Sequence, residues 1–152
     1  MTTIPRERPF TVSEYYRLQE AGILTEEDHV ELISGRIVTM SPIGSRHAAC
    51  VDRLTQLLSN QVGGSAIVRV QSPILLDDYS ETSASYDREI KVPLYAKAGL
   101  SAVWLVDLQE GNVETYTDLE DGVYRKMDKM RAGELSVKHI DGLTLTVAEI
   151  LG

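Results

Sequence analysis

The sequence has a single cysteine and no long apolar stretch, and both shortages limit the kinds of protein that it can encode. Cys50 is the one cysteine among 152 residues, so an internal disulfide is excluded and a zinc site is not indicated. The longest apolar runs, such as residues 102–106, are far too short to span a bilayer. No apolar segment follows the charged residues near the N-terminus, so we expect no secretory signal. These features together predict a protein of a reducing cytoplasm that makes no contact with membranes.

Basic residues are also scarce. Fifteen Lys and Arg stand against 23 Asp and Glu, which leaves a net charge of −8. A protein that holds nucleic acid by neutralising phosphates usually shows a basic face, and no run of Lys or Arg provides one here. Any DNA contact is therefore expected to be local, transient, assisted by a metal, or shared across an oligomer.

What the chain does contain is typical of a globular domain. Hydrophobic residues make up 43% of it and charged residues 25%, and 152 residues suffice for one domain with a real core. We therefore expect a single domain over residues 1–152.

The first half of the chain carries clear start and stop signals. Thr11 and Glu14 have the spacing of a capping box, which predicts a helix from Val12 to about Ala21. Two apolar stretches flank Ser34-Gly35, a good two-residue hairpin turn. Further along, the pattern predicts a helix over residues 47–62 and a β-rich segment over 66–76, followed by a polar, turn-like stretch over 77–85.

The second half begins with a predicted helix over residues 86–98, capped by Ser85 and kinked or ended by Pro93. Residues 102–106 show no alternation, which is typical of a central strand buried on both faces. An antiparallel meander follows, with strands expected over 113–117, 123–127, 135–140 and 143–147 before a final half-turn of helix. The pattern as a whole predicts an α/β (α+β) fold, with a mixed sheet flanked by helices and a C-terminal meander.

Four sequence blocks, in a fixed order, carry a resemblance to a known family. They are Glu31-Leu-Ile-Ser-Gly35; Met40-Ser-Pro42 with His47; Asp87, Lys91 and Tyr95 spaced by four; and Gly99, Trp104, Val106 and Asp107. In this order the chain resembles the Uma-type family of restriction-endonuclease-like proteins, part of the PD-(D/E)XK nuclease superfamily. The resemblance implies a restriction-endonuclease-like fold and Mg²⁺-dependent hydrolysis of DNA.

The resemblance also implies roles for individual residues. Glu31 corresponds to the first metal-binding acid, and Lys91 to the catalytic lysine, which orients water and offsets phosphoryl charge. Asp87, one turn earlier, would aim the Lys91 ammonium, and His47 would be a candidate base. Each has a plainer interpretation: a solvated helical ion pair for Asp87 and Lys91, an ordinary strand-edge acid for Glu31, and a helix cap or surface group for His47.

One part of the family pattern is missing. The strands with the Pro-Asp and Glu-Val-x-Ser motifs, which hold the catalytic metal, have no counterpart at the Glu81–Thr82 junction. The junction is either a natural deletion or the place of a segment absent from this sequence. Nearby acids are the available replacements, and Glu81 is our candidate second metal ligand beside Glu31; Asp77 and Asp78 are the others.

Two functions therefore stay open. One is a Mg²⁺-dependent DNA endonuclease, active or inactive according to its supply of metal-binding acids. The other is a non-catalytic, homo-oligomeric interaction protein, because losing two middle strands exposes sheet edges that a second copy could cover.

Overall fold

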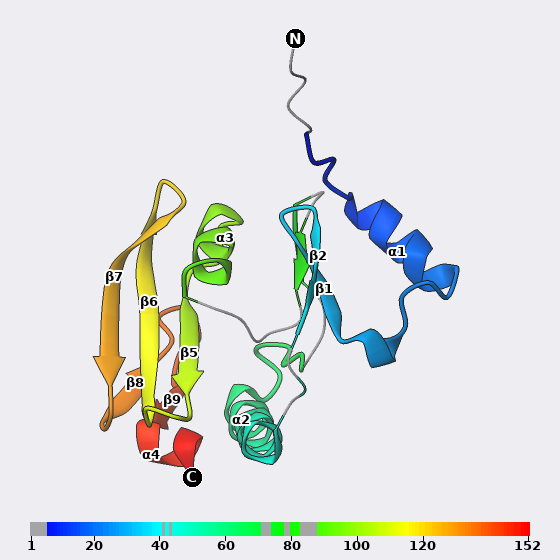
Figure 1. Cartoon of the computed structure of the whole chain (residues 1–152). Coiled ribbons are helices and arrows are strands. Elements are labelled where there is room, and N and C mark those ends of the chain that lie inside the picture. The colour runs from blue at the N-terminus through cyan, green and yellow to red at the C-terminus, as the bar shows by residue number, and fades with distance from the viewer. Residues whose placement is uncertain (1–5, 41, 43, 71–73, 78–79, 83–87) are drawn as a thin grey trace. The chain divides into compact units, whose positions relative to one another are not determined.

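The computed structural model describes residues 6–40, 42, 44–70, 74–77, 80–82 and 88–152 (Figure 1). The chain divides into two compact units, one of residues 1–42 and 71–85 and one of residues 43–70 and 86–152. The single domain expected over 1–152 stays a prediction. No helix in the described ranges is long and apolar enough to cross a membrane.

The first unit opens with helix α1 (Val12–Glu20), whose capping box is confirmed. The Thr11 hydroxyl accepts a hydrogen bond from the Glu14 N–H at 3.2 Å, and the Glu14 carboxylate accepts one from the Thr11 N–H at 2.9 Å. The helix buries Val12 and Tyr15 against Leu32, and these three side chains form a small apolar core. The Tyr15 hydroxyl also donates a hydrogen bond to the Val30 carbonyl oxygen at 3.0 Å, so helix and strand are held by polar as well as apolar contacts.

A four-stranded antiparallel sheet completes this unit, in the order β2-β1-β4-β3. The expected hairpin is present, with β1 (Val30–Ile33) and β2 (Arg36–Thr39) joined at Ser34-Gly35. Both turn residues have positive φ angles, 49° and 75°, as a two-residue hairpin turn requires. A short 3₁₀ helix, η1 (Glu26–Asp28), precedes β1.

The other two strands form a hairpin that the sequence did not indicate. Strand β3 (Ile74–Asp77) confirms the last part of the β-rich segment expected over 66–76. Strand β4 (Ser80–Thr82), which pairs with β3 and β1, lies where a polar turn was expected. The β-rich segment expected over 66–76 is wrong for residues 66–70, which are irregular, and residues 71–73 lie outside the described residues. Strand propensity depends on having a partner strand, which a single sequence does not reveal.

The second unit contains the other helices. Helix α2 (Ser45–Val62) confirms the helix expected over 47–62 and ends at Gly63, whose φ of 53° suits glycine. Helix α3 (Lys91–Lys97) is shorter than the helix expected over 86–98. Pro93 explains its start: it is the third residue of α3, where a missing N–H removes no intrahelical hydrogen bond, so it neither kinks nor ends the helix. The expected Ser85 cap lies outside the described residues.

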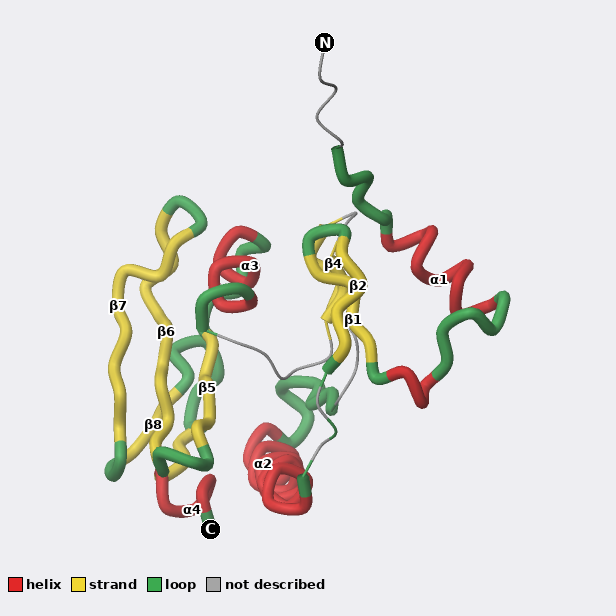
Figure 2. Tube along the Cα trace, viewed as in Figure 1, coloured by secondary structure: helices red, strands yellow, loops and turns green. Residues whose placement is uncertain are grey.

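The C-terminal meander is confirmed. Strands β5 (Val103–Asp107), β6 (Asn112–Glu120) and β7 (Val123–Met130) form an antiparallel sheet in that order (Figure 2). Strands β8 (Glu134–Ser136) and β9 (Thr144–Thr146) form a separate hairpin, and α4 (Val147–Leu151) ends the chain. The core of this unit is made by side chains of α2, β6, β8, β9 and α4, namely Cys50, Val113, Leu135, Leu145, Val147 and Ile150.

The α+β class is therefore confirmed, with two differences in the sheets. Every pairing among the described strands is antiparallel, so the mixed sheet that we expected is not seen in this part of the chain. Strand β5 was expected to be central and buried on both faces, but it is half-buried, and its one partner among the described strands is β6. Of its apolar residues, Trp104 and Val106 pack against the core of the unit.

Candidate functional site

Lys91 is the first residue of α3, and its side chain is completely buried, with an exposed fraction of 0%. A buried lysine is unusual, because the charged form loses its hydration. The interpretation of Lys91 as a solvated residue within a helix is wrong, since its side chain is buried and α3 begins at Lys91. Asp87, its expected partner, lies outside the described residues. Lys91 is thus a residue of the protein interior.

Glu31 lies in β1 and is also buried, at 8% exposed. Its Cα partner across the hairpin is Val38. Because Glu31 is buried, the plainer interpretation of this residue as an exposed strand-edge acid is wrong. The buried charged residues in the described part of the chain are Glu31, Lys91 and Glu114, so two of the three are residues singled out from the sequence.

Glu81 lies on the neighbouring strand. In the register of β1 and β4, its Cα partner is Leu32, the residue after Glu31. The register therefore brings the two strands together but does not pair Glu31 with Glu81. Of the other replacement acids, Asp77 ends β3 and Asp78 lies outside the described residues.

His47 lies in the first turn of α2 and is half-buried. The N-cap residue of this helix is Gly44, and no side chain caps it. The interpretation of His47 as a helix cap is therefore wrong. Its interpretation as a surface group and its role as a base both stay predictions.

The fit of these residues to Mg²⁺ is incomplete. Mg²⁺ is bound in proteins mainly by carboxylate and other oxygen ligands, often with phosphate oxygens. Nowhere in the described ranges do three or more His, Cys, Asp or Glu side chains come together in a way that could hold a metal ion. The described residues alone therefore do not form a metal centre.

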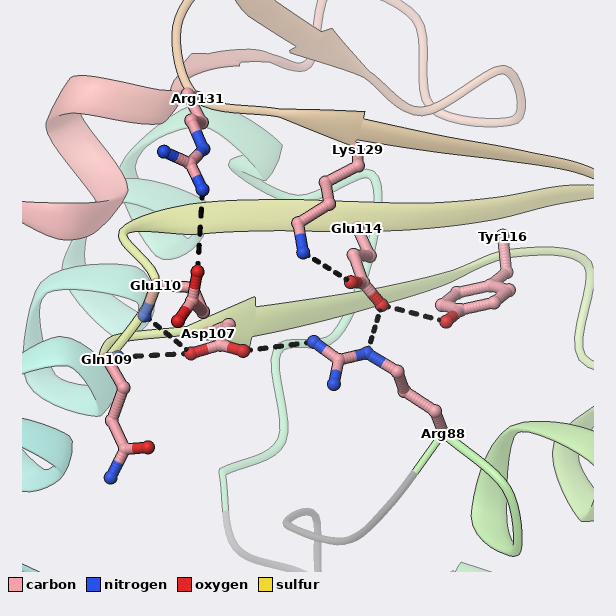
Figure 3. A network of polar contacts seen from close by, with 8 residues as sticks. All are labelled: Arg88, Asp107, Gln109, Glu110, Glu114, Tyr116, Lys129 and Arg131. Carbon is pink, nitrogen blue, oxygen red and sulfur yellow. Dashed lines mark hydrogen bonds and ion pairs between the residues drawn. The ribbon is translucent and has the colours of Figure 1, made fainter.

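A network of charged side chains includes Arg88, which is three residues before Lys91 in the sequence (Figure 3). The Arg88 guanidinium donates from Nε to Glu114 Oε2 at 2.6 Å and from Nη2 to Asp107 Oδ2 at 2.9 Å. Asp107 ends β5 and Glu114 lies in β6, opposite Leu105. One guanidinium thus joins the turn before α3 to two strands of the sheet. We call this arrangement of Arg88, Asp107 and Glu114 the arginine clamp.

Glu114 is the centre of the network and is almost fully buried, at 3% exposed. Its carboxylate also accepts a hydrogen bond from the Tyr116 hydroxyl at 2.9 Å and lies 3.5 Å from Lys129 Nζ. The hydrogen bond from Arg88 is the main cause that holds the pKa of Glu114 below its ordinary value, against the opposing effect of burial. Glu114 therefore stays a carboxylate in the interior because three partners favour its charged form.

Asp107 is fixed by the backbone as well as by Arg88. Its Oδ1 accepts hydrogen bonds from the N–H groups of Gln109 at 3.1 Å and Glu110 at 2.9 Å. The Glu110 N–H is the main cause that lowers the pKa of Asp107, and the bond from Arg88 adds to it. Glu110, in the same turn, is also paired: its Oε2 lies 3.4 Å from Nη2 of Arg131, the residue after β7. Asp107 is thus a rigid, charged anchor at the tip of the β5–β6 hairpin.

Two members of the clamp were not predicted from the sequence. Asp107 belongs to one of the four family-like blocks, but Arg88 and Glu114 were not singled out. They are 26 residues apart, and no short-range spacing rule joins them. The available signal was weak: Glu114 is a charged residue at a position of a predicted strand otherwise occupied by β-forming residues.

Comparison with known proteins gives one match. The model of the Uma2 family, described as "Putative restriction endonuclease", matches residues 12–82 and 79–148. The two matched segments overlap at residues 79–82, which include the Glu81–Thr82 junction. The comparison with curated proteins found no match.

Proposed function

Because the chain belongs to the Uma2 family of restriction-endonuclease-like proteins, we propose that its reaction is the Mg²⁺-dependent hydrolysis of phosphodiester bonds in DNA. Burial is the observation that carries this proposal. Lys91 and Glu31, the two residues assigned to catalysis and metal binding by resemblance, are 0% and 8% exposed. Charged groups are rarely kept in an interior without a functional or paired role.

In this proposal, Lys91 is the catalytic cation. Its ammonium has three donors, which can orient an attacking water and offset the charge that develops on phosphoryl oxygens. Glu31 would be a metal ligand, and a bound Mg²⁺ would supply Lewis acidity at the phosphate. Asp87 would aim the ammonium of Lys91, and His47 is the proposed base. The remaining metal ligands would come from the acids before the junction, with Glu81 first among them.

A plasmid-nicking assay with Mg²⁺ tests the catalytic role of Lys91. Lys91→Ala should nick at least about a hundredfold more slowly, the range found when a transition-state donor is removed. Lys97→Ala is the matched control, because Lys97 lies on the same helix and is exposed. The proposal fails if Lys91→Ala and the unaltered protein nick at the same rate, or if neither nicks.

Metal binding is tested separately by calorimetry with Mg²⁺ and Mn²⁺. Glu31→Ala should lose most of the binding heat, and Glu20→Ala, at the exposed end of α1, should bind as the unaltered protein does. An identical titration for Glu31→Ala would remove Glu31 from the metal site. Intact mass and the coding DNA establish whether the Glu81–Thr82 junction is natural.

A second candidate function is supported by the charges. The basic residues of β7 all face acids: Arg125 lies 3.2 Å from Glu120, Lys126 3.1 Å from Asp128, and Lys129 3.5 Å from Glu114. Cations already paired with acids offer little to a phosphate backbone, which fits a net charge of −8.

These charges favour a non-catalytic protein that associates with copies of itself. Light scattering after size-exclusion chromatography tests this function. A concentration-dependent dimer without nicking would support it, and a monomer at all concentrations would contradict it.

A further inference from the structure

Helix α3 lacks a local signal that would fix its first residue. Its N-cap residue is Ile90, which has no side-chain hydrogen-bonding group, and no cap hydrogen bond is formed. Helices usually begin at Ser, Thr, Asp or Asn, whose side chains accept from the first free N–H groups. Seven residues are also too few for a helix to be stable by itself. The position of Lys91 at the start of α3 must therefore come from tertiary contacts.

We propose that Arg88 is a positioning residue, which sets the place of the Lys91 side chain by tying the turn before α3 to β5 and β6. The contacts of the arginine clamp do not depend on whether the protein is an enzyme. Their importance for catalysis rests on the proposed function of Lys91. Arg88 is separated from Lys91 by two residues, which form a turn. A shift of Arg88 is therefore passed directly to the first turn of α3.

The geometry of the clamp suits arginine in particular. A guanidinium is planar and presents its donors in a fixed fork, so two bonds fix its orientation as well as its position. Here the two acceptors belong to different strands, Asp107 on β5 and Glu114 on β6. A lysine ammonium is a point charge without a fork, so it would not fix the same orientation.

The other end of α3 is held independently. The Tyr124 hydroxyl of β7 donates a hydrogen bond to the Leu100 carbonyl oxygen at 2.7 Å, just after the helix ends. Gly122, in the β6–β7 turn, lies against Lys97: a Cβ at this glycine would be 3.5 Å from the Lys97 Cα. The helix thus has two anchors, and the arginine clamp is the one beside Lys91.

Acetylation of lysines in the folded protein, followed by mass spectrometry, tests the proposal without any need for activity. Lys91 should be protected in the unaltered protein and should react about tenfold faster in Arg88→Gln. The reason is that the charged hydrogen bonds from residue 88 to Asp107 and Glu114 are lost. Arg88→Lys should not restore the protection. Tyr124→Phe, which releases the other anchor, is the matched control and should leave Lys91 protected.

A further measurement separates positioning from a general loss of stability. Alkylation of Cys50, buried in the core of the same unit, reports opening of the whole unit. Arg88→Gln should speed the acetylation of Lys91 without speeding the alkylation of Cys50. If both rates rise together, Arg88 is merely structural and the proposal is overturned.

A double-mutant cycle tests whether Arg88 acts through Glu114. Glu114→Gln should expose Lys91 as Arg88→Gln does, and the double variant should add little, because both changes break the contact between Arg88 and Glu114. Additive effects, or unchanged protection of Lys91 in Arg88→Gln, would overturn the proposal. If the protein nicks DNA, Arg88→Gln should lower kcat with little change in KM. If the protein does not nick DNA but Lys91 is acetylated faster in Arg88→Gln, only the proposed function is contradicted.

Discussion

The guanidinium of Arg88 lies between two carboxylates, 2.6 Å from that of Glu114 and 2.9 Å from that of Asp107. The Arg88 side chain is 44% exposed, whereas the Glu114 side chain is 3% exposed. The pair therefore differs from a surface ion pair, because one partner has given up its hydration. Such a carboxylate depends on its partners, and the dependence can be measured.

Replacing Glu114 by glutamine removes the charge and keeps the size. We expect Glu114→Gln to lower the free energy of unfolding by about 2 kcal/mol at neutral pH, in the range found for hydrogen bonds to charged groups. Urea unfolding followed by circular dichroism measures this. Glu120→Gln is the control, since its pair with Arg125 is exposed on both sides and should contribute almost nothing. Equal losses in the two variants would mean that burial of Glu114 has no energetic consequence.

The same carboxylate should make stability depend on pH in the acid range. Its pKa in the folded protein is lower than the ordinary value of 4.5, so the fold favours the charged form. The stabilisation is complete above about pH 4.5 and is lost as the pH falls through the lower, folded-state pKa. The stability difference between the unaltered protein and Glu114→Gln should therefore be largest near pH 7 and shrink in acid. A difference that stays constant down to about pH 3 would contradict this.

Tyr116 should ionise late. Burial, and then the hydrogen bond that it donates to Glu114, raise its pKa to about 12 from an ordinary value of 10.0. In Glu114→Gln, the negative acceptor is gone, so the pKa of Tyr116 should fall toward its ordinary value. Titration of the tyrosine ring carbons by NMR measures this pKa. An unchanged pKa in Glu114→Gln would leave burial as the sole cause.

Cys50 should be unreactive in the folded protein. It is buried in α2, and burial raises the pKa of its thiol, which lowers the fraction of reactive thiolate. Alkylation by iodoacetamide should therefore be slow in buffer and fast in denaturing urea, as followed by intact mass. Because Cys50 is the one cysteine, a single added group reports the reaction. Fast alkylation without urea would show that this part of the core opens readily.

Much of the fold could be predicted from the sequence, because its signals are local. The capping box at Thr11 and Glu14, the Ser34-Gly35 turn and the glycine after α2 each specify backbone geometry within a few residues. The meander after β5 was equally predictable, since its turns contain glycine at positive φ. Strand β4 was missed because a short polar strand is defined by its partner strands.

The site was less predictable. Family resemblance selected Glu31 and Lys91, and their burial distinguishes them from surface charges, which no spacing rule could have shown. The start of α3 was placed too early because the helical pattern extends over residues that form a turn. Arg88 and Glu114 were missed because a contact between residues 26 apart leaves no mark in a single sequence.

The arginine clamp also constrains when the fold can be completed during synthesis. The partners of Arg88 lie 19 and 26 residues downstream. Until the ribosome has added Glu114 and released it from the exit tunnel, the turn before α3 has no carboxylate of β6 to bind. The clamp at the start of this helix therefore closes only when the two strands that follow it are present.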